Sequence, residues 1–331
     1  MEKTVGILER LKRDVVLGAE GYIFELERRG YVKAGPYIPE VVLEYPEAVK
    51  ELHREFLRAG AEVMVALTYY AHREKMKAAG GKDYVETLNR SAVRLAKEVA
   101  AEESALVAGN LSNTWKYNEK DPEGSEKIIR PMFEEQVSWA VEEGVDFIIA
   151  ETFAHFGEAR LALEAIKQSN LPSFITFAAK YGRSEDGYTW DEACKILTDN
   201  GAYIVGLNCA RGPDTMYGIL SSIRESVGGY IAAQPVAYRT TEEQPFFQAL
   251  KGRSGKSAFP LSLDPFLLTR SEMAEFAVRA REMGVNYIGV CCGGAPHHVR
   301  AMAEALGRTV PASKYSPDLS QHPILGSSKT L

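Results

Sequence analysis

Eight short, nearly continuous apolar segments recur along the chain. They are rich in Val, Ile and Ala and barely alternate with polar residues, which is typical of parallel strands buried on both faces. The segments occupy residues 15–22, 63–71, 105–112, 146–154, 173–179, 203–210, 230–238 and 287–294. The pattern therefore predicts eight strands of one parallel sheet.

Longer amphipathic segments lie between these strands. In residues 46–60, the apolar residues Val49, Leu52 and Phe56 recur at helical spacing, and Gly60 stands where a C-terminal cap is expected. The same periodicity predicts helices over residues 83–103, 133–144, 158–169, 190–201, 214–229, 271–284 and 296–307. Eight strands, each followed by a helix, over about 310 residues are typical of a (β/α)8 TIM barrel of the α/β class.

We therefore expect one barrel domain over residues 1–310. An open doubly wound sheet is the structural alternative, but the glycines of the segment GAEGYIFE lack the spacing of its phosphate-binding turn. Residues 239–270 are predicted to be a long insertion after the seventh strand, because they are rich in Gly, Pro and Ser. Residues 311–331 show neither the helical nor the strand period of apolar residues and are predicted to be a C-terminal tail, either extended or disordered.

Charge and composition narrow the classes of function. The chain has 39 basic and 45 acidic side chains, a net charge of −6, and no block of basic residues. A nucleic-acid or acidic-membrane binder requires the opposite sign. The chain contains no apolar run of the ~18 residues that span a bilayer, and its first residues are charged where a secretion signal is apolar. We expect a cytoplasmic protein that binds neither nucleic acid nor membrane.

Three of the four cysteines stand in positions that suggest a metal site. Cys209 closes the sixth predicted strand, and Cys291 and Cys292 close the eighth. Functional side chains of a barrel gather at the carboxyl ends of its strands, and three thiolates there suit a tetrahedral Zn²⁺ with one open position, as in catalytic zinc sites. Simple packing is the alternative, and a redox pair at Cys291–Cys292 lacks the usual two-residue spacer. Cys194 is predicted to be a core residue.

Two histidines, His297 and His298, follow the cysteine pair at the start of the last predicted helix. They are expected to bind backbone or water; zinc ligation is the alternative.

Several motifs resemble the homocysteine S-methyltransferase family, and within it the betaine–homocysteine methyltransferases. They are GLNCA, GVCCGGAPHHVRAMAEAL, RRGYVKAGPYIPE, HREFLRAGAEVM, ALVAG and QPVAY. The resemblance covers residues 5–310. It implies a (β/α)8 barrel with Zn²⁺ on Cys209, Cys291 and Cys292, and transfer of a methyl group to homocysteine, giving methionine, without S-adenosylmethionine.

The chemistry of such a transfer predicts two small-molecule substrates. The thiolate is the nucleophile, and a metal favours it at neutral pH. The methyl donor is an onium compound, a betaine-like quaternary amine or a sulfonium, because its positive charge creates a neutral leaving group. Aromatic faces hold such cations. Four tyrosines near one rim can form this site: Tyr22, Tyr37, Tyr69 and Tyr70.

The resemblance implies that three of these, Tyr37, Tyr69 and Tyr70, help form the donor pocket. The alternative is that they only cap the barrel. Trp115 is a further candidate.

Polar residues at the same rim are candidates for binding the acceptor. Glu151 ends the fourth predicted strand, where a carboxylate is costly to bury without a partner, and the resemblance implies that it binds the amino group of homocysteine. Glu151 and Tyr70 are the catalytic candidates. Asn208 is predicted to orient a ligand or the substrate, and Gln234 to contact either substrate.

One turn departs from the family pattern. Most members carry Asp-Gly-Gly after the first strand, where the Asp holds the amino group of homocysteine; this chain has Ala19, Glu20 and Gly21. Either Glu20 takes over the ammonium contact, or the acceptor is not homocysteine.

Two further functions stay open. One is a methyltransferase module that works with a corrinoid or folate partner, and the other is a non-catalytic zinc-binding barrel. The animal betaine enzymes use a longer C-terminal extension in oligomer contacts, so their assembly is not carried over, and a homo-oligomer is left open.

Overall fold

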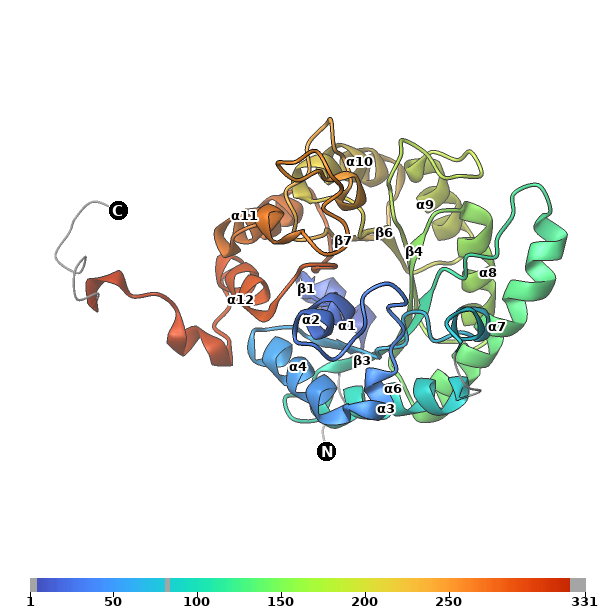
Figure 1. Cartoon of the computed structure of the whole chain (residues 1–331), viewed down its shortest axis with the longest axis horizontal. Coiled ribbons are helices and arrows are strands. Elements are labelled where there is room, and N and C mark those ends of the chain that lie inside the picture. The colour runs from blue at the N-terminus through green and yellow to red at the C-terminus, as the bar shows by residue number, and fades with distance from the viewer. Residues whose placement is uncertain (1–4, 81–83, 322–331) are drawn as a thin grey trace.

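The computed structural model describes residues 5–80 and 84–321. Eight parallel strands form one sheet in the order β1-β8-β7-β6-β5-β4-β3-β2, and Figure 1 shows the helices around it. The strands are β1 (Val16–Leu17), β2 (Val63–Val65), β3 (Leu106–Ser112), β4 (Phe147–Phe153), β5 (Ser173–Phe177), β6 (Ile204–Asn208), β7 (Tyr230–Gln234) and β8 (Tyr287–Ile288). The predicted (β/α)8 barrel is confirmed.

The sheet is closed between β1 and β2 by one side chain as well as by backbone. The amide of Glu62 donates to the carbonyl of Leu17 (2.8 Å), and the amide of Leu17 donates to the carboxylate of Glu62 (2.9 Å). Arg308 contacts the same carboxylate at 2.6 Å. A carboxylate thus takes the place of a backbone acceptor at the seam of the barrel.

All eight predicted helices are present. They are α4 (Pro46–Arg58), α6 (Val85–Ala100), α7 (Pro122–Glu143), α8 (Phe156–Lys167), α9 (Trp190–Asp199), α10 (Pro213–Ser226), α11 (Arg270–Glu282) and α12 (Pro296–Ala305). Helix α7 begins earlier than its apolar period predicts, because the Asp121 side chain caps it by accepting from the amide of Gly124 (3.0 Å).

Shorter helices that the periodicity did not predict are α1 (Ile7–Arg13), α2 (Tyr22–Arg28), α3 (Val41–Glu44), α5 (Arg73–Ala78) and the 3₁₀ turns η1 (Phe247–Ala249), η2 (Asp264–Phe266), η3 (Pro311–Tyr315) and η4 (Leu319–Gln321).

The strands at the seam are much shorter than the apolar segments. The prediction that Tyr22 ends the first strand is wrong: Gly21 adopts a left-handed φ of 87°, and Tyr22 begins α2. Cys291 lies beyond β8, where its amide bonds to the carbonyl of Pro235 (2.9 Å). Backbone bonds of the parallel kind still continue past the regular strands, from the amide of Glu20 to the carbonyl of Val290 (3.0 Å) as well as from Cys291 to Pro235, and both segments are buried at the mouth.

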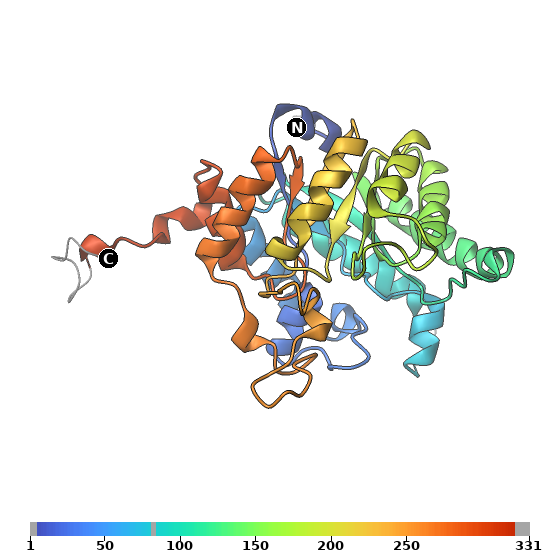
Figure 2. The same ribbon diagram turned by 90° about the horizontal axis from the view of Figure 1, so that it is seen from above.

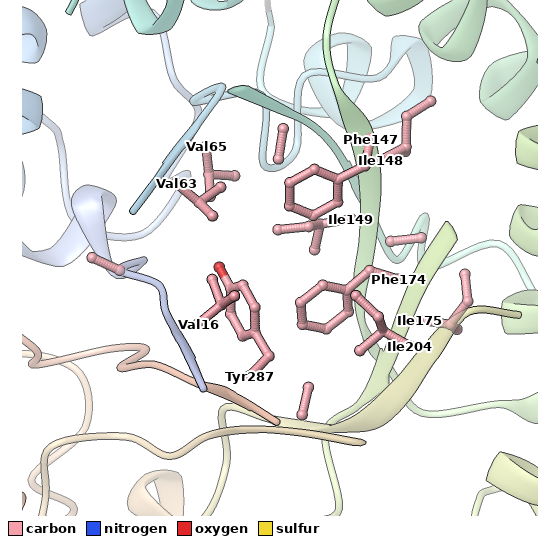
Figure 3. Close-up of a cluster of buried hydrophobic side chains, with 14 of the residues drawn as sticks. Val16, Val63, Val65, Phe147, Ile148, Ile149, Phe174, Ile175, Ile204 and Tyr287 are labelled. Atoms are coloured by element: carbon pink, nitrogen blue, oxygen red, sulfur yellow. The ribbon is translucent and has the colours of Figure 1, made fainter. Parts of the chain in front are cut away.

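The interior of the barrel is packed with apolar side chains (Figure 3). The rings of Phe147 and Phe174 stack with centroids 6.5 Å apart, and Tyr287 meets Phe174 edge-on at 4.7 Å. Each is fully buried, and burying such a ring contributes roughly 1.5–3 kcal/mol. This packed layer supports the carboxyl ends of the strands, where the candidate site lies.

Two regions extend beyond the barrel repeat. The insertion that follows β7 projects from one end of the barrel, and α1 lies at the opposite end (Figure 2). The insertion is anchored by Phe247, whose amide donates to the carbonyl of Ala210 (2.9 Å) and whose ring stacks on Tyr238. Residues 311–321 extend away from the barrel (Figures 1 and 2). Within the described ranges, none of the helices combines the length and apolar character that crossing a membrane requires.

Candidate active site

Three cysteine side chains meet at the carboxyl ends of β6 and β8. The Sγ atom of Cys209, directly after β6, lies 3.7 Å from the Sγ atom of Cys292. The Sγ atoms of Cys291 and Cys292 are 4.0 Å apart, and all three sulfurs lie within 4.8 Å of one another. Two segments that are distant in sequence thus form one sulfur cluster.

Strained and closely packed backbone holds these thiols in place. Cys209 and Ala210 have left-handed φ angles of 56° and 52°, which cost a residue with a side chain about 1–2 kcal/mol. The amide of Cys209 donates to the carbonyl of Gln234 (2.9 Å) and fixes the turn. Gly21 packs so closely that a Cβ atom there would lie 2.5 Å from the carbonyl oxygen of Cys291. Such strain is typical of functional sites.

The three cysteines are suited to hold a divalent metal ion. Hydrogen bonds from Cys291 and Cys292 lower the pKa of the Cys209 thiol, and the same bonds to Cys209 raise the pKa values of the other two. Three buried thiolates repel one another, and a cation offsets that repulsion. In a tetrahedral site with metal–sulfur bonds of about 2.3 Å, the sulfurs are about 3.8 Å apart. The Cys209–Cys292 and Cys291–Cys292 separations of 3.7 and 4.0 Å agree with this spacing.

A cavity of about 540 Å³ opens beside the sulfur cluster. Its walls come from the loops that follow the strands and from the insertion, which contributes Phe247, Gln248 and Phe259. Most of the predicted site residues line it: Glu20, Tyr22, Tyr37, Tyr69, Tyr70, Glu151, Cys209, Cys291 and Cys292. The structure thus brings aromatic, acidic and sulfur groups together in one space.

Aromatic rings surround the outer part of this cavity. The ring centroids of Tyr69 and Tyr70 are 4.3 Å apart, and Trp115 lies 6.2 Å from Tyr70. Tyr37 stacks on Phe24 with centroids 5.2 Å apart. Burial raises the pKa of both Tyr37 and Tyr70 to about 12, so their hydroxyls stay neutral near pH 7. The rings can therefore attract a cation without offering it a phenolate nucleophile.

Two carboxylates lie at the base of the cavity. Glu151 accepts hydrogen bonds from the side-chain amides of Asn110 and Asn208, both at 2.6 Å. Carboxylate oxygens of Glu20 and Glu151 lie within 4.8 Å of each other and of the Cys291 sulfur. Burial raises the pKa of both carboxyl groups, and the charge of Glu20 raises that of Glu151 further. A cationic group placed between them would relieve this repulsion.

Two residues that were predicted to orient or contact a substrate, Asn208 and Gln234, lie behind the lining of the cavity. Asn208 donates to Glu151 and accepts from the amide of Thr152 (2.9 Å), so it orients the carboxylate. Gln234 is fully buried next to Glu20. Neither the Gln234 amide nor the Glu20 carboxylate has a hydrogen-bond partner of good geometry in the described part of the chain.

The histidine pair lies apart from the sulfur cluster. The Nδ1 atom of His298 accepts from the amide of Ala295 (3.1 Å), so its Nε2 atom donates to the carbonyl of Leu268 (2.9 Å). Cys194 is fully buried in the core.

Asn110 and Thr152 are site residues that the sequence reasoning missed. Asn110 was visible as a polar residue inside the apolar segment 105–112. Thr152 has a left-handed φ of 65°, for which the sequence gives no signal.

The fold and this site define an α/β-barrel protein with a thiol-rich centre beside an aromatic cavity. The sequence model of the family "Homocysteine S-methyltransferase" matches residues 20–306. The chain is 40% identical over 315 residues to betaine–homocysteine S-methyltransferase 1 of Xenopus tropicalis, covering 91% of this chain and 75% of that protein. It is 37% identical over 309 residues to an S-methylmethionine–homocysteine S-methyltransferase of Pongo abelii, covering 91% and 81%.

The fold is similar to that of the homocysteine methyltransferase MmuM from Escherichia coli in its oxidized form. The TM-score is 0.70 at 20% identity, covering 90% of this chain and 98% of the other. The chain belongs to the homocysteine S-methyltransferase family and is a methyltransferase. This overturns the alternative of a non-catalytic zinc-binding barrel.

Proposed function

We propose that this protein moves a methyl group from an onium donor to the thiol of homocysteine, giving methionine, and that it depends on Zn²⁺ and not on S-adenosylmethionine. The observation that carries the proposal is the sulfur cluster of Cys209, Cys291 and Cys292 at the wall of an aromatic cavity. Zn²⁺ bound there supplies a Lewis acid that lowers the pKa of an acceptor thiol.

The acidic base of the cavity is suited to the ammonium group of the acceptor. Among the described residues, the oxygens of Glu20 and the amide of Gln234 have no hydrogen-bond partner of good geometry. Asn110 and Asn208 hold Glu151 in one orientation. An amino acid bound with its sulfur toward the cysteines places its ammonium near both carboxylates. This supports the reading in which Glu20 takes over the contact that the family's Asp makes.

The aromatic wall is suited to the donor. Tyr69, Tyr70 and Trp115 attract a methylated cation with about 0.5–2 kcal/mol per ring, depending on desolvation. In the reaction, the acceptor sulfur forms a bond to the methyl carbon while the carbon–nitrogen or carbon–sulfur bond of the donor breaks. The bonding electrons leave with a neutral amine or sulfide, and the thiol proton goes to solvent. Alignment of the two substrates supplies much of the rate.

The direct test is methionine formation from homocysteine with a panel of betaines and sulfonium compounds, together with metal analysis. The variant Cys291→Ala should lose bound zinc. Its turnover should fall by more than the roughly 10- to 100-fold that losing a group behind a ligand costs, because a ligand itself is missing. Cys194→Ala is the matched control, since Cys194 is equally buried but lies in the core, and it should keep both. The absence of methionine with every donor would refute the proposal.

A further inference from the structure

Lys180 places an isolated positive charge in the wall of an otherwise acidic cavity. Four carboxylates line the same space: Glu20, Glu151, Glu158 and Glu185. Lys180 is the one lysine or arginine in this lining, and it forms no ion pair within 4.0 Å with the described residues. A half-buried ammonium group without an ionic partner loses part of its hydration, and a bound anion would offset that cost.

The backbone of Lys180 is held firmly at this position. Its amide donates to the carbonyl of Ala178 (2.8 Å), and its carbonyl accepts from Nη2 of Arg211 (2.9 Å). The same guanidinium donates to the carbonyls of Ala179 and Thr215. Arg211 therefore joins the loop after β5 to the loop after β6.

The hydrogen bonds of Arg211 also hold Lys180 near the sulfur cluster. Arg211 lies two residues after Cys209, and its amide donates to the carbonyl of Cys209 (2.6 Å). Lys180 and Cys209 both line the same cavity. One short segment thus fixes both a sulfur of the cluster and the lysine beside it.

We propose that Lys180 binds the carboxylate of a zwitterionic methyl donor. The assignment rests on the proposed function and names its donor class: the onium end lies against the aromatic wall, and the carboxylate end lies against Lys180. The lysine makes the site favour donors with a carboxylate over simple cations, whereas an aromatic and acidic cavity alone would favour the simple cations.

Two sulfonium donors test the proposal because they share a reacting centre and differ by one carboxylate. They are dimethylsulfonioacetate and trimethylsulfonium. In the zinc-loaded wild type, kcat/KM is expected to be at least tenfold higher for dimethylsulfonioacetate. In Lys180→Met, that ratio should fall by about 10- to 100-fold, the range for losing one charged hydrogen bond. The kcat/KM for trimethylsulfonium should rise, since a repelling charge is gone.

Controls separate this role from a structural one. Lys195→Met removes an exposed lysine of α9 and should leave the ratio at its wild-type value, and Lys180→Arg should restore part of it. An unchanged ratio in Lys180→Met, an equal loss with both donors, or a rise confined to the KM for homocysteine would each overturn the proposal; the last would assign Lys180 to the acceptor.

A binding measurement keeps the two proposals distinguishable. If the wild type methylates homocysteine with none of the betaines and sulfonium compounds of the panel, the proposed function fails. Titration calorimetry with glycine betaine and tetramethylammonium then tests Lys180 by itself. The proposal predicts that Lys180→Met weakens the binding of glycine betaine at least tenfold more than the binding of tetramethylammonium. An equal loss of affinity for both ligands would refute it.

Discussion

Backbone strain is concentrated in residues at the mouth of the barrel. Eight described residues with side chains have positive φ angles, and five of them line the cavity: Tyr37, Tyr70, Trp115, Thr152 and Cys209. At about 1–2 kcal/mol each, this conformation persists only where neighbouring contacts fix it. Tyr70 shows how: its amide donates to the hydroxyl of Ser112 (3.0 Å), which lies at the end of β3. The barrel stabilises these residues in positions that serve the site.

His53 shows the cost of burying a titratable residue without a partner. Its ring is fully buried against Tyr22, and neither nitrogen has a hydrogen-bond partner in the described ranges. Burial lowers the pKa of His53 to about 4, below the unfolded value of about 6.5. The unfolded chain therefore takes up a proton first as the pH falls, and stability is lost between about pH 6.5 and pH 4.

We predict that His53 makes the free energy of unfolding about 2 kcal/mol lower at pH 5 than at pH 7.5. Urea unfolding at the two pH values measures this difference, and His53→Leu should reduce it by that amount. His297→Leu, on the exposed residue of the histidine pair, is the control and should reduce it less. Equal pH dependence in wild type and His53→Leu would show that the histidine is not the cause.

Residues of the site differ in how far the sequence could predict them. Cys209, Cys291 and Glu151 were visible because each breaks an apolar segment with a chemically specific group near its end. Tyr22 was misplaced in a strand, because the turn at Gly21 depends on close packing against Cys291. Lys180 was missed, since nothing local distinguishes a lysine beside a cavity from one in solvent.

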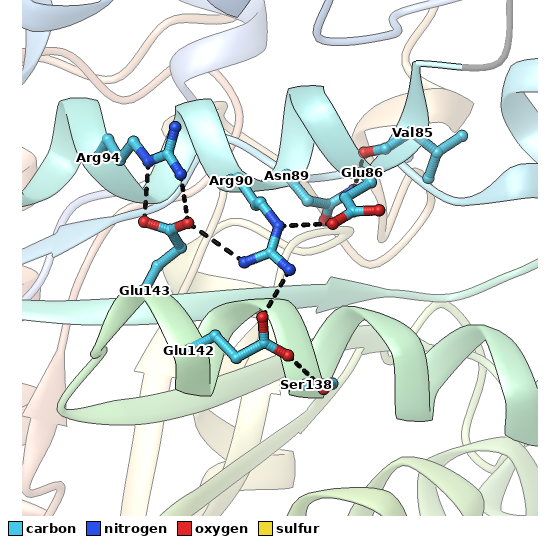
Figure 4. A network of polar contacts seen from close by, with 8 residues as sticks. All are labelled: Val85, Glu86, Asn89, Arg90, Arg94, Ser138, Glu142 and Glu143. Carbon is cyan, nitrogen blue, oxygen red and sulfur yellow. Dashed lines mark hydrogen bonds and ion pairs between the residues drawn. The ribbon is translucent and has the colours of Figure 1, made fainter.

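At the scale of elements, α6 and α7 are joined by a cluster of ion pairs (Figure 4). Arg90 contacts Glu86, Glu142 and Glu143 at 2.7, 2.6 and 3.2 Å. Arg94 also reaches Glu143, at 2.7 Å. These groups lie at the surface, so their attraction is screened by salt. A network of this kind stabilises neighbouring helices more than a single exposed pair does.

We expect Arg90→Ala to lower the thermal midpoint of unfolding at low ionic strength and to have much less effect in about 1 M salt, where the screening length is only about 3 Å. Thermal denaturation followed by circular dichroism gives both values. Lys195→Ala is the matched control, because it removes one exposed pair with Asp199; its effect should be smaller. A salt-independent loss in Arg90→Ala would indicate packing of the side chain instead.

The strands and main helices were predictable because burial imposes their pattern. A strand covered on both faces has to be apolar along its whole length, and a covering helix has to be apolar every three or four residues. Helices α2, α3 and α5 were not predicted, since each spans two turns or fewer. The lengths of β1 and β8 were overestimated, because the buried segments that follow them are as apolar as strands and keep some parallel backbone bonds.

For the whole molecule, the seam between β1 and β2 decides whether the barrel is closed. Leu17 is fully buried, and its amide has the carboxylate of Glu62 as acceptor. Arg308, which follows α12, holds that carboxylate and also contacts Asp14 at 3.2 Å. The seam therefore links the first strand to the segment that follows the last barrel helix. Sequence periodicity gives no sign of this seam, because a single side chain, that of Glu62, takes the place of a regular series of backbone hydrogen bonds between strands.

Removing this carboxylate should weaken closure. In Glu62→Ala the amide of Leu17 loses its acceptor, and a buried unpaired donor costs about 1–3 kcal/mol. We predict a loss of that size in the free energy of unfolding, together with faster hydrogen exchange in β1 and β2. Glu62→Gln should lose less, since its carbonyl still accepts from Leu17. Glu47→Ala, which removes a glutamate with a 78% exposed side chain, is the control. Unchanged exchange in Glu62→Ala would show that backbone bonds alone close the barrel.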